Sequence, residues 1–212
     1  MSHKPRAEMI EETRTKLIRA ARQQFGKAGY AATVMDDLTA QAGLTRGALY
    51  HHFGDKKGLF LAVLQDLDRE LDVRLDTAEK DEADEWSAFK FRCQGYLAMS
   101  LEPEVQRIMF RDAASVLDFS ILKSHELACV QGITRRLTHL METGRIKQVA
   151  PDVLALFING GLYECAMWIV HSDDPQATYE KVRVSFDQLL EFTGIKKPRT
   201  LQGFHYRSQK AQ

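Results

Sequence analysis

The sequence predicts an all-α protein with a small N-terminal head and a larger helical body. Glycine and proline are scarce, with 13 and 5 residues in a chain of 212. Apolar residues recur at the three- and four-residue spacing of helices over most of the chain, and the alternation typical of β-strands is nearly absent. We expect the head at residues 1–55, the body at residues 56–195, and a loose basic tail at residues 196–212.

Composition and cysteine usage exclude several classes of protein. Cys93, Cys129 and Cys165 lie far apart and form no CxxC pair, which argues against a zinc site or a disulfide framework and favours a reducing cytosol. The N-terminus has no apolar segment of signal-peptide length, and we find no run of about 18 apolar residues for a membrane span. Catalytic and nucleotide-binding motifs are missing. These observations predict a soluble cytoplasmic protein that is not an enzyme and holds no metal or cofactor.

Charge is distributed unevenly along the chain, although its formal net charge is zero. Residues 1–60 hold ten basic and six acidic side chains, a net charge of +4, and the remainder carries −4. A basic head on an acidic body is expected when only one end of a protein meets DNA. Asymmetry of this size is common, so it supports a nucleic-acid partner without establishing one.

The head begins with a disordered arm at residues 1–10, followed by a helix from about residue 12 to residue 28. Lys27-Ala-Gly29 ends this helix with a glycine. One apolar stripe, expected to brace the rest of the head, is formed by Leu17, Ala20, Ala21 and Phe25.

Residues 33–59 predict two short helices joined by a tight turn. Thr33 is suited to cap the first helix, because its hydroxyl can accept from a free backbone N–H one turn on. Gly43 can adopt the positive φ that ends a helix, after which Leu44 points back inward.

The second of these helices exposes a polar face at its start. Thr45 is placed to cap it, and Leu49 and Phe53 face the core at i, i+4. The opposite, solvent side carries Arg46, Gly47, Tyr50 and His51. A short helix with this face suits the major groove of DNA, which is read from the N-terminal residues of such a helix.

The same stretch resembles the signature of a known family. Residues 42–53, A-G-L-T-R-G-A-L-Y-H-H-F, followed by Lys56 and Leu59, are similar to the helix-turn-helix of the TetR family of transcriptional regulators. The segment Phe25-Gly-Lys-Ala-Gly-Tyr-Ala-Ala-Thr33 also resembles that family. The resemblance is specific from about residue 18 to residue 64.

This resemblance implies a set of DNA contacts in the head. The residues implied to face base edges or backbone are Arg46, Gly47, Ala48, Tyr50 and His51, and those implied to hold phosphates are Thr33, Thr45 and Lys56. Asp55 and Lys57 stand where the family commonly has Ser or Asp and then Glu, and a second lysine adds a phosphate contact.

Helical spacing continues through the body. The expected helices are 56–78, 85–100, 103–117, 121–143, 151–171 and 175–194. The first begins at the head with Lys56 and Lys57 and would be a rigid rod joining the two parts. The fifth is apolar all round over residues 153–158, so it should be buried on more than one side. Gly160 and Gly161 in its middle favour a close helix approach or a bend.

By the resemblance, the body encloses a cavity for a small-molecule effector whose binding moves the rod. The residues that can line it are Trp86, Phe89, Tyr96, Met99, Arg107, Phe110, His125, Cys129, Tyr163 and Met167. For each of them an ordinary core position is the alternative. Arg107 and His125 stand out because a polar group among apolar helices must find a partner. That partner is either an acidic or phenolic ligand, or Glu104 or Glu164.

His125 and Cys129 lie four residues apart on one expected helix, a spacing that can chelate a metal. No third ligand is identifiable. The sequence therefore favours a packed histidine and a buried thiol over a metal site.

The last two helices predict a homodimer. By the resemblance they pair with their copies in a four-helix bundle across a two-fold axis. The side chains assigned to this interface are Phe157, Tyr179, Val182, Phe186, Leu189 and Leu190. Such a dimer asks for a near-palindromic operator, because its reading helices stand about 34–36 Å apart or somewhat further. The alternative is that these helices only complete the core of one protomer.

We therefore expect a homodimeric, sequence-specific DNA-binding repressor that a small-molecule ligand releases from its double-stranded operator. One alternative is an activator or broad DNA binder with the same head. The other is a helical ligand-binding protein or enzyme in which the head is vestigial.

Overall fold

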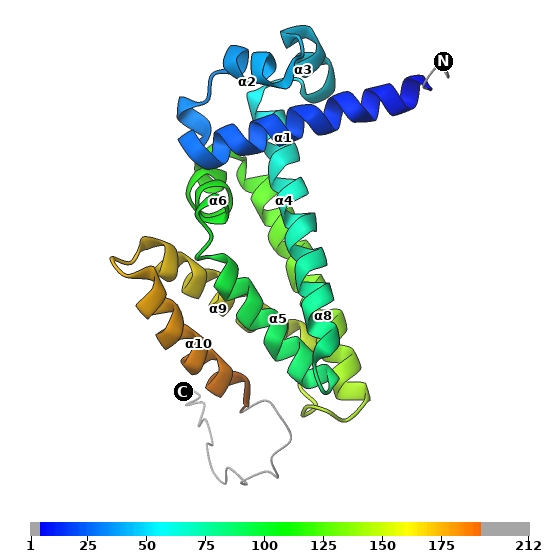
Figure 1. The fold of residues 1–212 in the computed structure, drawn as a ribbon. Coiled ribbons are helices and arrows are strands. Elements are labelled where there is room, and N and C mark those ends of the chain that lie inside the picture. The colour runs from blue at the N-terminus through cyan, green and yellow to red at the C-terminus, as the bar shows by residue number, and fades with distance from the viewer. Residues whose placement is uncertain (1–4, 192–212) are drawn as a thin grey trace, which may run out of the picture.

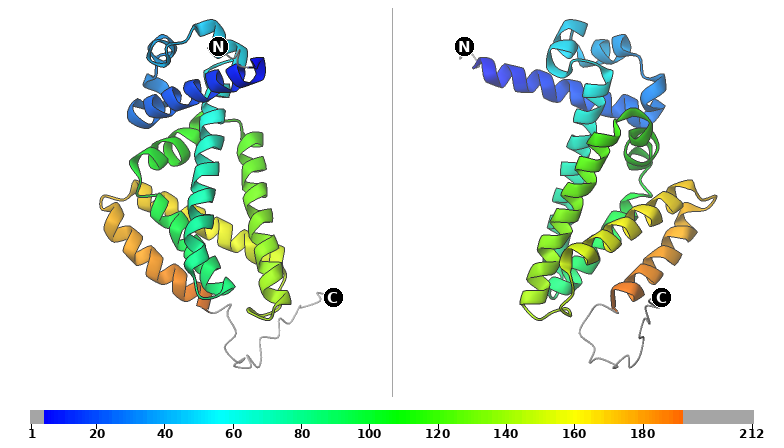
Figure 2. Two further views of the ribbon diagram at one scale, coloured as in Figure 1. Left: turned by 45° about the vertical axis from the view of Figure 1, so that its right-hand side comes forward. Right: turned by 180° about the vertical axis from the view of Figure 1, so that it is seen from behind.

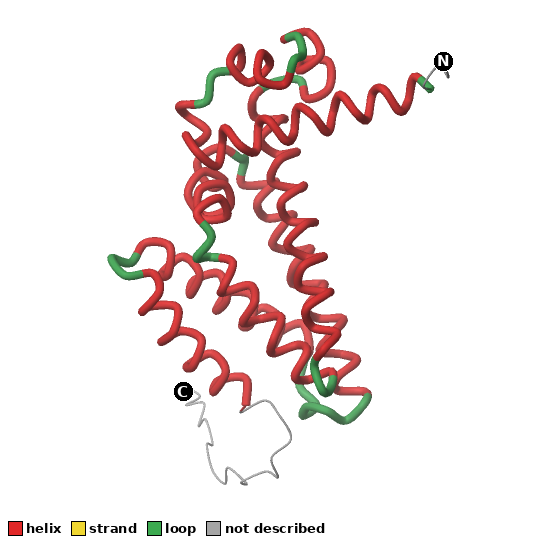
Figure 3. The backbone as a smooth tube through the Cα atoms, viewed as in Figure 1, coloured by secondary structure: helices red, strands yellow, loops and turns green. Residues whose placement is uncertain are grey.

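The computed structural model describes residues 5–191, and every regular element in this range is helical (Figures 1 and 3). The head contains α1 (Arg6–Ala32), α2 (Met35–Ala42) and α3 (Arg46–Phe53). The body contains α4 (Lys56–Ala78), η1 (Glu79–Asp81), α5 (Glu85–Met99), α6 (Pro103–Val105), η2 (Gln106–Asp112), α7 (Ala113–Val116), α8 (Phe119–Glu142), α9 (Pro151–His171) and α10 (Pro175–Glu191). The all-α prediction is confirmed. The predicted tail and the last predicted turn of the final helix lie outside the described residues.

The head lies across one end of α4, and α4 continues to the opposite end of the molecule (Figure 1). In both views of Figure 2, α8 starts near the head and ends near the far end of α4. Helices α9 and α10 form an antiparallel pair at the edge of the body. Helix α4 therefore spans both parts of the protein, as predicted for the rod.

The predicted arm at residues 1–10 is wrong for its second half. Helix α1 begins at Arg6, directly after Pro5. No glycine or proline interrupts the chain before Gly26, so nothing in the sequence stops the helix from extending to this point. Glu8 in the first turn also favours the helix start electrostatically.

Helix α1 bends near its C-terminal end at Gly29, whose φ of 83° and ψ of 168° are accessible almost only to glycine. A Cβ atom at this position would lie 2.0 Å from Nη2 of Arg107. The backbone conformation therefore requires glycine at position 29, and a side chain there would also displace the Arg107 guanidinium.

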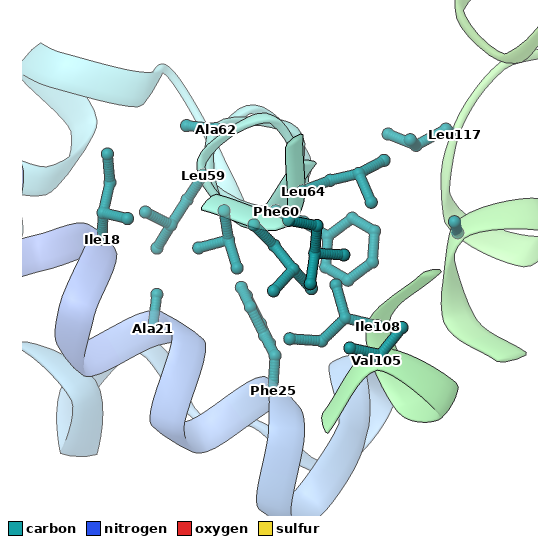
Figure 4. Packing of buried hydrophobic residues seen from close by; sticks show 14 of the residues in the cluster. Ile18, Ala21, Phe25, Leu59, Phe60, Ala62, Leu64, Val105, Ile108 and Leu117 are labelled. Carbon is teal, nitrogen blue, oxygen red and sulfur yellow. The ribbon is translucent and has the colours of Figure 1, made fainter. Parts of the chain in front are cut away.

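Two apolar cores hold the molecule together. The first, which we call the head–body core, joins α1, α4 and η2 (Figure 4). At its centre the Phe60 ring packs edge-on against Phe25 and Tyr30, with ring centroids 5.3 Å apart in both pairs. The second core lies among α5, α8, α9 and α10. The four apolar residues predicted for the stripe of α1 are buried.

The predicted helix over residues 103–117 contains a π-helical segment. It begins at Pro103, as expected, but the backbone widens to a π-helix over Gln106–Asp112 before α7. π-Helical segments are rare in proteins, and those that occur are often found at functional sites. This one faces the bend of α1 and places Arg107 and Asp112 beneath it.

Helix α9 is less buried than predicted. Phe157 and Trp168 are 74% and 58% exposed, so only one face of the helix is covered within the protomer. The close approach predicted at the glycine pair holds for Gly161, where a Cβ would lie 3.4 Å from the Phe186 ring, whereas Gly160 faces open space. By length and composition α9 could cross a membrane, with a third of its apolar window buried. We had expected no segment with the length and apolar composition of a membrane span, and α9 has both.

We predict that Gly29→Ala lowers the free energy of unfolding by about 1–3 kcal/mol, because alanine is strained in this backbone conformation and its methyl group displaces the Arg107 guanidinium. The matched control is Gly132→Ala within α8, where only Arg135 Nη2 at 3.9 Å approaches the new methyl group. That control should stabilise the protein by up to about 1 kcal/mol. Urea unfolding followed by circular dichroism measures both. Equal stability of the two variants would contradict the role assigned to Gly29.

Candidate functional site

The turn between α2 and α3 has the geometry expected of a helix-turn-helix. Gly43 adopts the left-handed conformation with φ 65° and ψ 33°, and the Leu44 N–H donates to the Thr39 carbonyl over 2.9 Å. Thr45 caps α3, its Oγ1 accepting from the Ala48 N–H at 3.2 Å. The predicted turn conformation of Gly43 and the predicted N-cap role of Thr45 are therefore confirmed.

Helix α3 turns one face inward and one outward. Leu49 is fully buried, whereas Tyr50 is 43% exposed. Arg46, Gly47 and His51 are also exposed, and Ala48 is partly buried. We call these residues of α3, Arg46 to His51 without Leu49, the reading surface.

The Arg46 guanidinium is held loosely at this surface. Its Nε lies 3.1 Å from Oδ1 of Asp36, and its Nη2 lies 3.4 Å from the Tyr50 hydroxyl. Exposed ion pairs of this kind contribute only about 0–1 kcal/mol. The guanidinium can therefore exchange Asp36 for a base edge or a phosphate at small cost.

Two other residues implied to contact DNA have partners within the protein. The N-cap role of Thr33 is wrong: α2 begins after Val34, and Thr33 ends α1 with its hydroxyl donating to the Gly29 carbonyl at 2.8 Å. Thr33 is only 5% exposed, so its hydroxyl does not lie on the surface. Lys57 has a partner within the protein, because its Nζ lies 2.6 Å from Oδ2 of Asp118 in an exposed ion pair, and the phosphate contact implied for it stays a prediction.

Lys56 and Asp55 lie at the start of α4. The Asp55 carboxylate caps this helix by accepting from the Gly58 N–H at 2.7 Å. The Lys56 ammonium lies 4.5 Å from the centroid of the Tyr30 ring, and burial lowers the pKa of Lys56. The long lysine stem allows the ammonium to leave the ring for a nearby phosphate.

A group of polar contacts, which we call the head–body latch, ties α1 to the segment Pro103–Asp112. The Tyr30 N–H donates to Oδ2 of Asp112 at 2.7 Å, and Nη2 of Arg107 donates to the Ala28 carbonyl at 3.1 Å. Arg22 binds Glu104 through two hydrogen bonds of 2.9 and 2.8 Å. Fork-to-fork pairs of this kind fix geometry as well as adding energy.

A second set of contacts, which we call the α4–α8 ladder, joins the rod to α8. Its first rung is Lys57 with Asp118 at the head end. The middle rung is Nε2 of His125 with Oδ2 of Asp68 at 2.6 Å. At the far end, Nη1 of Arg136 donates to Oε1 of Glu79 at 2.8 Å. Charged side chains thus connect α8 to the rod at its two ends and at its middle.

The middle rung belongs to a polar cluster in the body. Nδ1 of His125 lies 3.9 Å from Sγ of Cys129. The hydrogen bond to Asp68, and then that to Cys129, raises the pKa of His125 to about 10. Burial raises the pKa of Tyr96, with further contributions from the charges of Cys129, Tyr163 and Asp68. Helices α4, α5, α8 and α9 thus each bring a polar side chain to one place.

Two family models match this chain. The model described as "Tetracyclin repressor-like, C-terminal domain" matches residues 86–192, and the model described as "Bacterial regulatory proteins, tetR family" matches residues 17–63. The chain belongs to the TetR family of transcriptional regulators. The resemblance seen in residues 42–53 is therefore confirmed, and the reading surface is part of a DNA-binding head.

Individual TetR-family proteins are similar over most of the chain. A regulator from Pectobacterium atrosepticum is 43% identical with a TM-score of 0.80, covering 91% of this chain and 99% of its own. The regulator TtgR of Pseudomonas putida is 30% identical over 148 residues, 66% of this chain and 70% of its own. SmeT, solved as a complex with triclosan, shares the fold, with a TM-score of 0.64, 18% identity and coverage of 88% and 93%.

The predicted effector residues separate into three groups. Tyr96, His125, Cys129 and Tyr163 belong to the polar cluster, and Phe110 packs against Tyr96 with ring centroids 6.4 Å apart. Met99, Phe110 and Met167 belong to the head–body core. Trp86 and Phe89 stack on each other at 5.7 Å in the second core, as ordinary packing would require.

Three of these predictions need correction. Arg107 does not point into the body, because it forms the latch with Ala28. His125 pairs with Asp68, which the sequence analysis missed in favour of Glu104 or Glu164. Cys129 is exposed rather than buried. Asp68 lies on the rod among apolar positions and is separated from His125 by 57 positions in the sequence. No local sequence pattern therefore indicated that the two residues pair.

The dimer prediction is corrected for half of its residues. Val182, Phe186 and Leu190 are at most 5% exposed and pack inside the protomer. They occupy the face of α10 that covers α9, which an amphipathic pattern cannot distinguish from an intersubunit face. Phe157 and Leu189 are exposed and Tyr179 is partly buried.

We predict that Asp68→Asn lowers the pKa of His125 from about 10 toward its ordinary value, as nuclear magnetic resonance of the imidazole would measure. A group whose pKa is higher in the folded state than in the unfolded state stabilises the fold when it is protonated. This stabilisation is complete below the unfolded-state pKa and is lost as the pH rises through the folded-state pKa. The stability difference between the natural protein and the variant should therefore be largest below about pH 6.5 and fade toward pH 10. A difference independent of pH would contradict the assigned charge.

Proposed function

We propose that this TetR-family protein is a homodimeric repressor that a small molecule releases from a near-palindromic operator. The observation that carries the proposal is the reading surface: α3 exposes Arg46, Gly47, Tyr50 and His51 on a helix-turn-helix frame. Arginine bidentate to guanine is the commonest specific contact in the major groove. Lys56 and Thr45 flank the helix and suit phosphate contacts that position it.

The exposed face of α9 supports the dimer. Its apolar side chains occupy one arc of the helix, and Gly160 lies in the same arc with open space above it. The exposed apolar residues of this face are Val153, Leu156, Phe157, Tyr163 and Trp168. On α10, Leu189 is 59% exposed. A second copy of the chain covers such a surface symmetrically, residue against equivalent residue.

Release from DNA follows from the connections of α4. A ligand that separates α8 from α4 at the polar cluster displaces the rod through the ladder, and the rod carries α3 with it. The two reading surfaces of the dimer then no longer match the operator spacing. The ligand must favour the non-binding spacing, and operator DNA must weaken ligand binding by the same factor. The triclosan complex of SmeT supports a small-molecule effector for this body fold.

The first test is recovery of genomic fragments by the purified protein, followed by footprinting. We predict that the natural protein protects a near-palindrome and that Arg46→Ala with Tyr50→Ala loses it. Loss of one bidentate contact per half-site should cost about 1–3 kcal/mol in affinity. Equal, salt-sensitive capture of all fragments would instead indicate binding to the DNA backbone alone.

A charge control separates reading from positioning. Lys56→Ala should weaken binding to every sequence about equally and reduce the salt dependence of the affinity. Lys80→Ala removes one exposed positive charge in η1, just beyond the far end of α4, and should leave the affinity unchanged. Operator affinity that no effector alters would overturn release by a ligand.

For the dimer we predict that Phe157→Asp, which places a charge in the centre of the exposed face of α9, yields a monomer in sedimentation equilibrium. A buried, unpaired charge at an interface costs several kcal/mol, enough to dissociate two copies. Phe119→Asp is the matched control: Phe119 is 80% exposed, but at the start of α8. A dimer that survives Phe157→Asp, or dissociates equally with Phe119→Asp, would rule out this interface.

A further inference from the structure

Cys129 stands at the end of a linear arrangement of three functional groups. The Asp68 carboxylate binds Nε2 of His125 at 2.6 Å, and Nδ1 of the same imidazole faces Sγ of Cys129 at 3.9 Å, within the range of a hydrogen bond to sulfur. Cys129 and His125 lie one turn apart on α8, and Asp68 projects from α4. A nucleophile, a base beside it and a group that orients the base are the parts of an activated thiol.

The charge state of the imidazole favours a nucleophilic sulfur. Because Asp68 raises the pKa of His125 to about 10, the ring is an imidazolium at neutral pH and carries a proton on each nitrogen. A cationic N–H donor beside a cysteine stabilises the thiolate, which is the reactive form. The negative carboxylate in turn keeps the ring oriented with Nδ1 toward the sulfur.

The other two thiols of the chain have the opposite surroundings. Cys93 is 4% exposed, and burial raises its pKa to about 12. Burial also raises the pKa of Cys165, which is half-buried. Cys129 alone among the three is both exposed and paired with a charged imidazole. Cys93 and Cys165 can therefore serve as controls for the reactivity of Cys129.

We propose that Cys129 is an activated thiol that adds to small α,β-unsaturated carbonyl compounds, quinones among them, and that its adduct releases the protein from DNA. The regulatory part rests on the function proposed above and specifies its effector class as electrophiles that bind covalently.

The addition needs no oxidant and no cofactor. The thiolate lone pair forms a carbon–sulfur bond at the β-carbon of the acceptor, and the electron pair of the carbon–carbon double bond moves toward the carbonyl oxygen to give an enolate. The imidazolium of His125 supplies the proton that converts this enolate to the saturated carbonyl product, and solvent reprotonates the ring.

The position of the adduct explains its effect on the head. The sulfur lies next to the middle rung of the α4–α8 ladder, which joins His125 to Asp68 on the rod. Carbon atoms added to Sγ compete with the imidazole for its place and lengthen or break this rung. The remaining rungs, Lys57 with Asp118 and Arg136 with Glu79, lie at the two ends of the interface, so the adduct changes the connection between α8 and α4 at its middle.

The test uses the full chain and N-ethylmaleimide, an α,β-unsaturated carbonyl probe, at less than one equivalent. Peptide mass spectrometry should place the adduct on Cys129, with Cys93 and Cys165 unmodified. His125→Gln should slow the addition by about tenfold or more and remove the ultraviolet absorbance of the thiolate. Asp68→Asn should reduce both, and Cys165→Ser should change neither. Reaction at Cys165 as fast as at Cys129, or a rate unaffected by His125→Gln, would overturn the activated thiol.

The regulatory part is read from operator affinity. The Cys129 adduct should weaken binding by about tenfold or more, whereas Cys129→Ser should bind the operator normally and ignore the probe. An adduct that leaves the affinity unchanged would overturn this part. If Cys129→Ser is still released by another small molecule, the proposed function stands and the electrophile effector falls. If neither the natural protein nor any variant binds a specific DNA site, the proposed function fails. The activated thiol is then tested separately, by the rates of N-ethylmaleimide addition.

Discussion

The shared burial of α4 is the constraint on which the rest of the structure depends. Phe60 packs against Phe25 and Tyr30 of α1, and the same helix continues with Leu67, Leu71 and Leu75 into the body. Close-packed interiors transmit displacements rather than absorbing them, because they contain few voids. The head therefore does not change its orientation independently of the rod.

Polar contacts decide what the rod is attached to. The head–body latch joins α1 to the π-helical segment, where the widened backbone places Arg107 and Asp112 beneath the bend at Gly29. The α4–α8 ladder joins the rod to α8 through charged pairs. Such pairs have well-defined alternative partners, unlike an apolar contact, so they suit an interface that has two arrangements. Helix α4 is consequently fastened by apolar packing on one side and by exchangeable polar contacts on the other.

The polar composition of the middle rung sets it apart from the other two. The end rungs pair a lysine or an arginine with a carboxylate. The middle rung contains an imidazole with a sulfur behind it. It is the rung of the three at which covalent chemistry can alter the connection between α8 and the rod.

The sequence by itself determined the helices and the reading surface, because their signals are local. Gly43 and Thr45 specify the turn through backbone conformation and capping, and the spacing of Leu49 and Phe53 leaves Arg46 and Tyr50 outside. The rod was also predicted, since its buried leucines and phenylalanine follow one helical stripe.

Only the tertiary structure decided which polar groups meet. Asp68 with His125, Arg107 with Ala28 and Tyr30 with Asp112 join residues at least 57 positions apart, and no local pattern encodes such a pairing. The tertiary structure also decided which apolar face of α10 packs within the protomer. An amphipathic helix must bury its apolar stripe, but its sequence does not say against what.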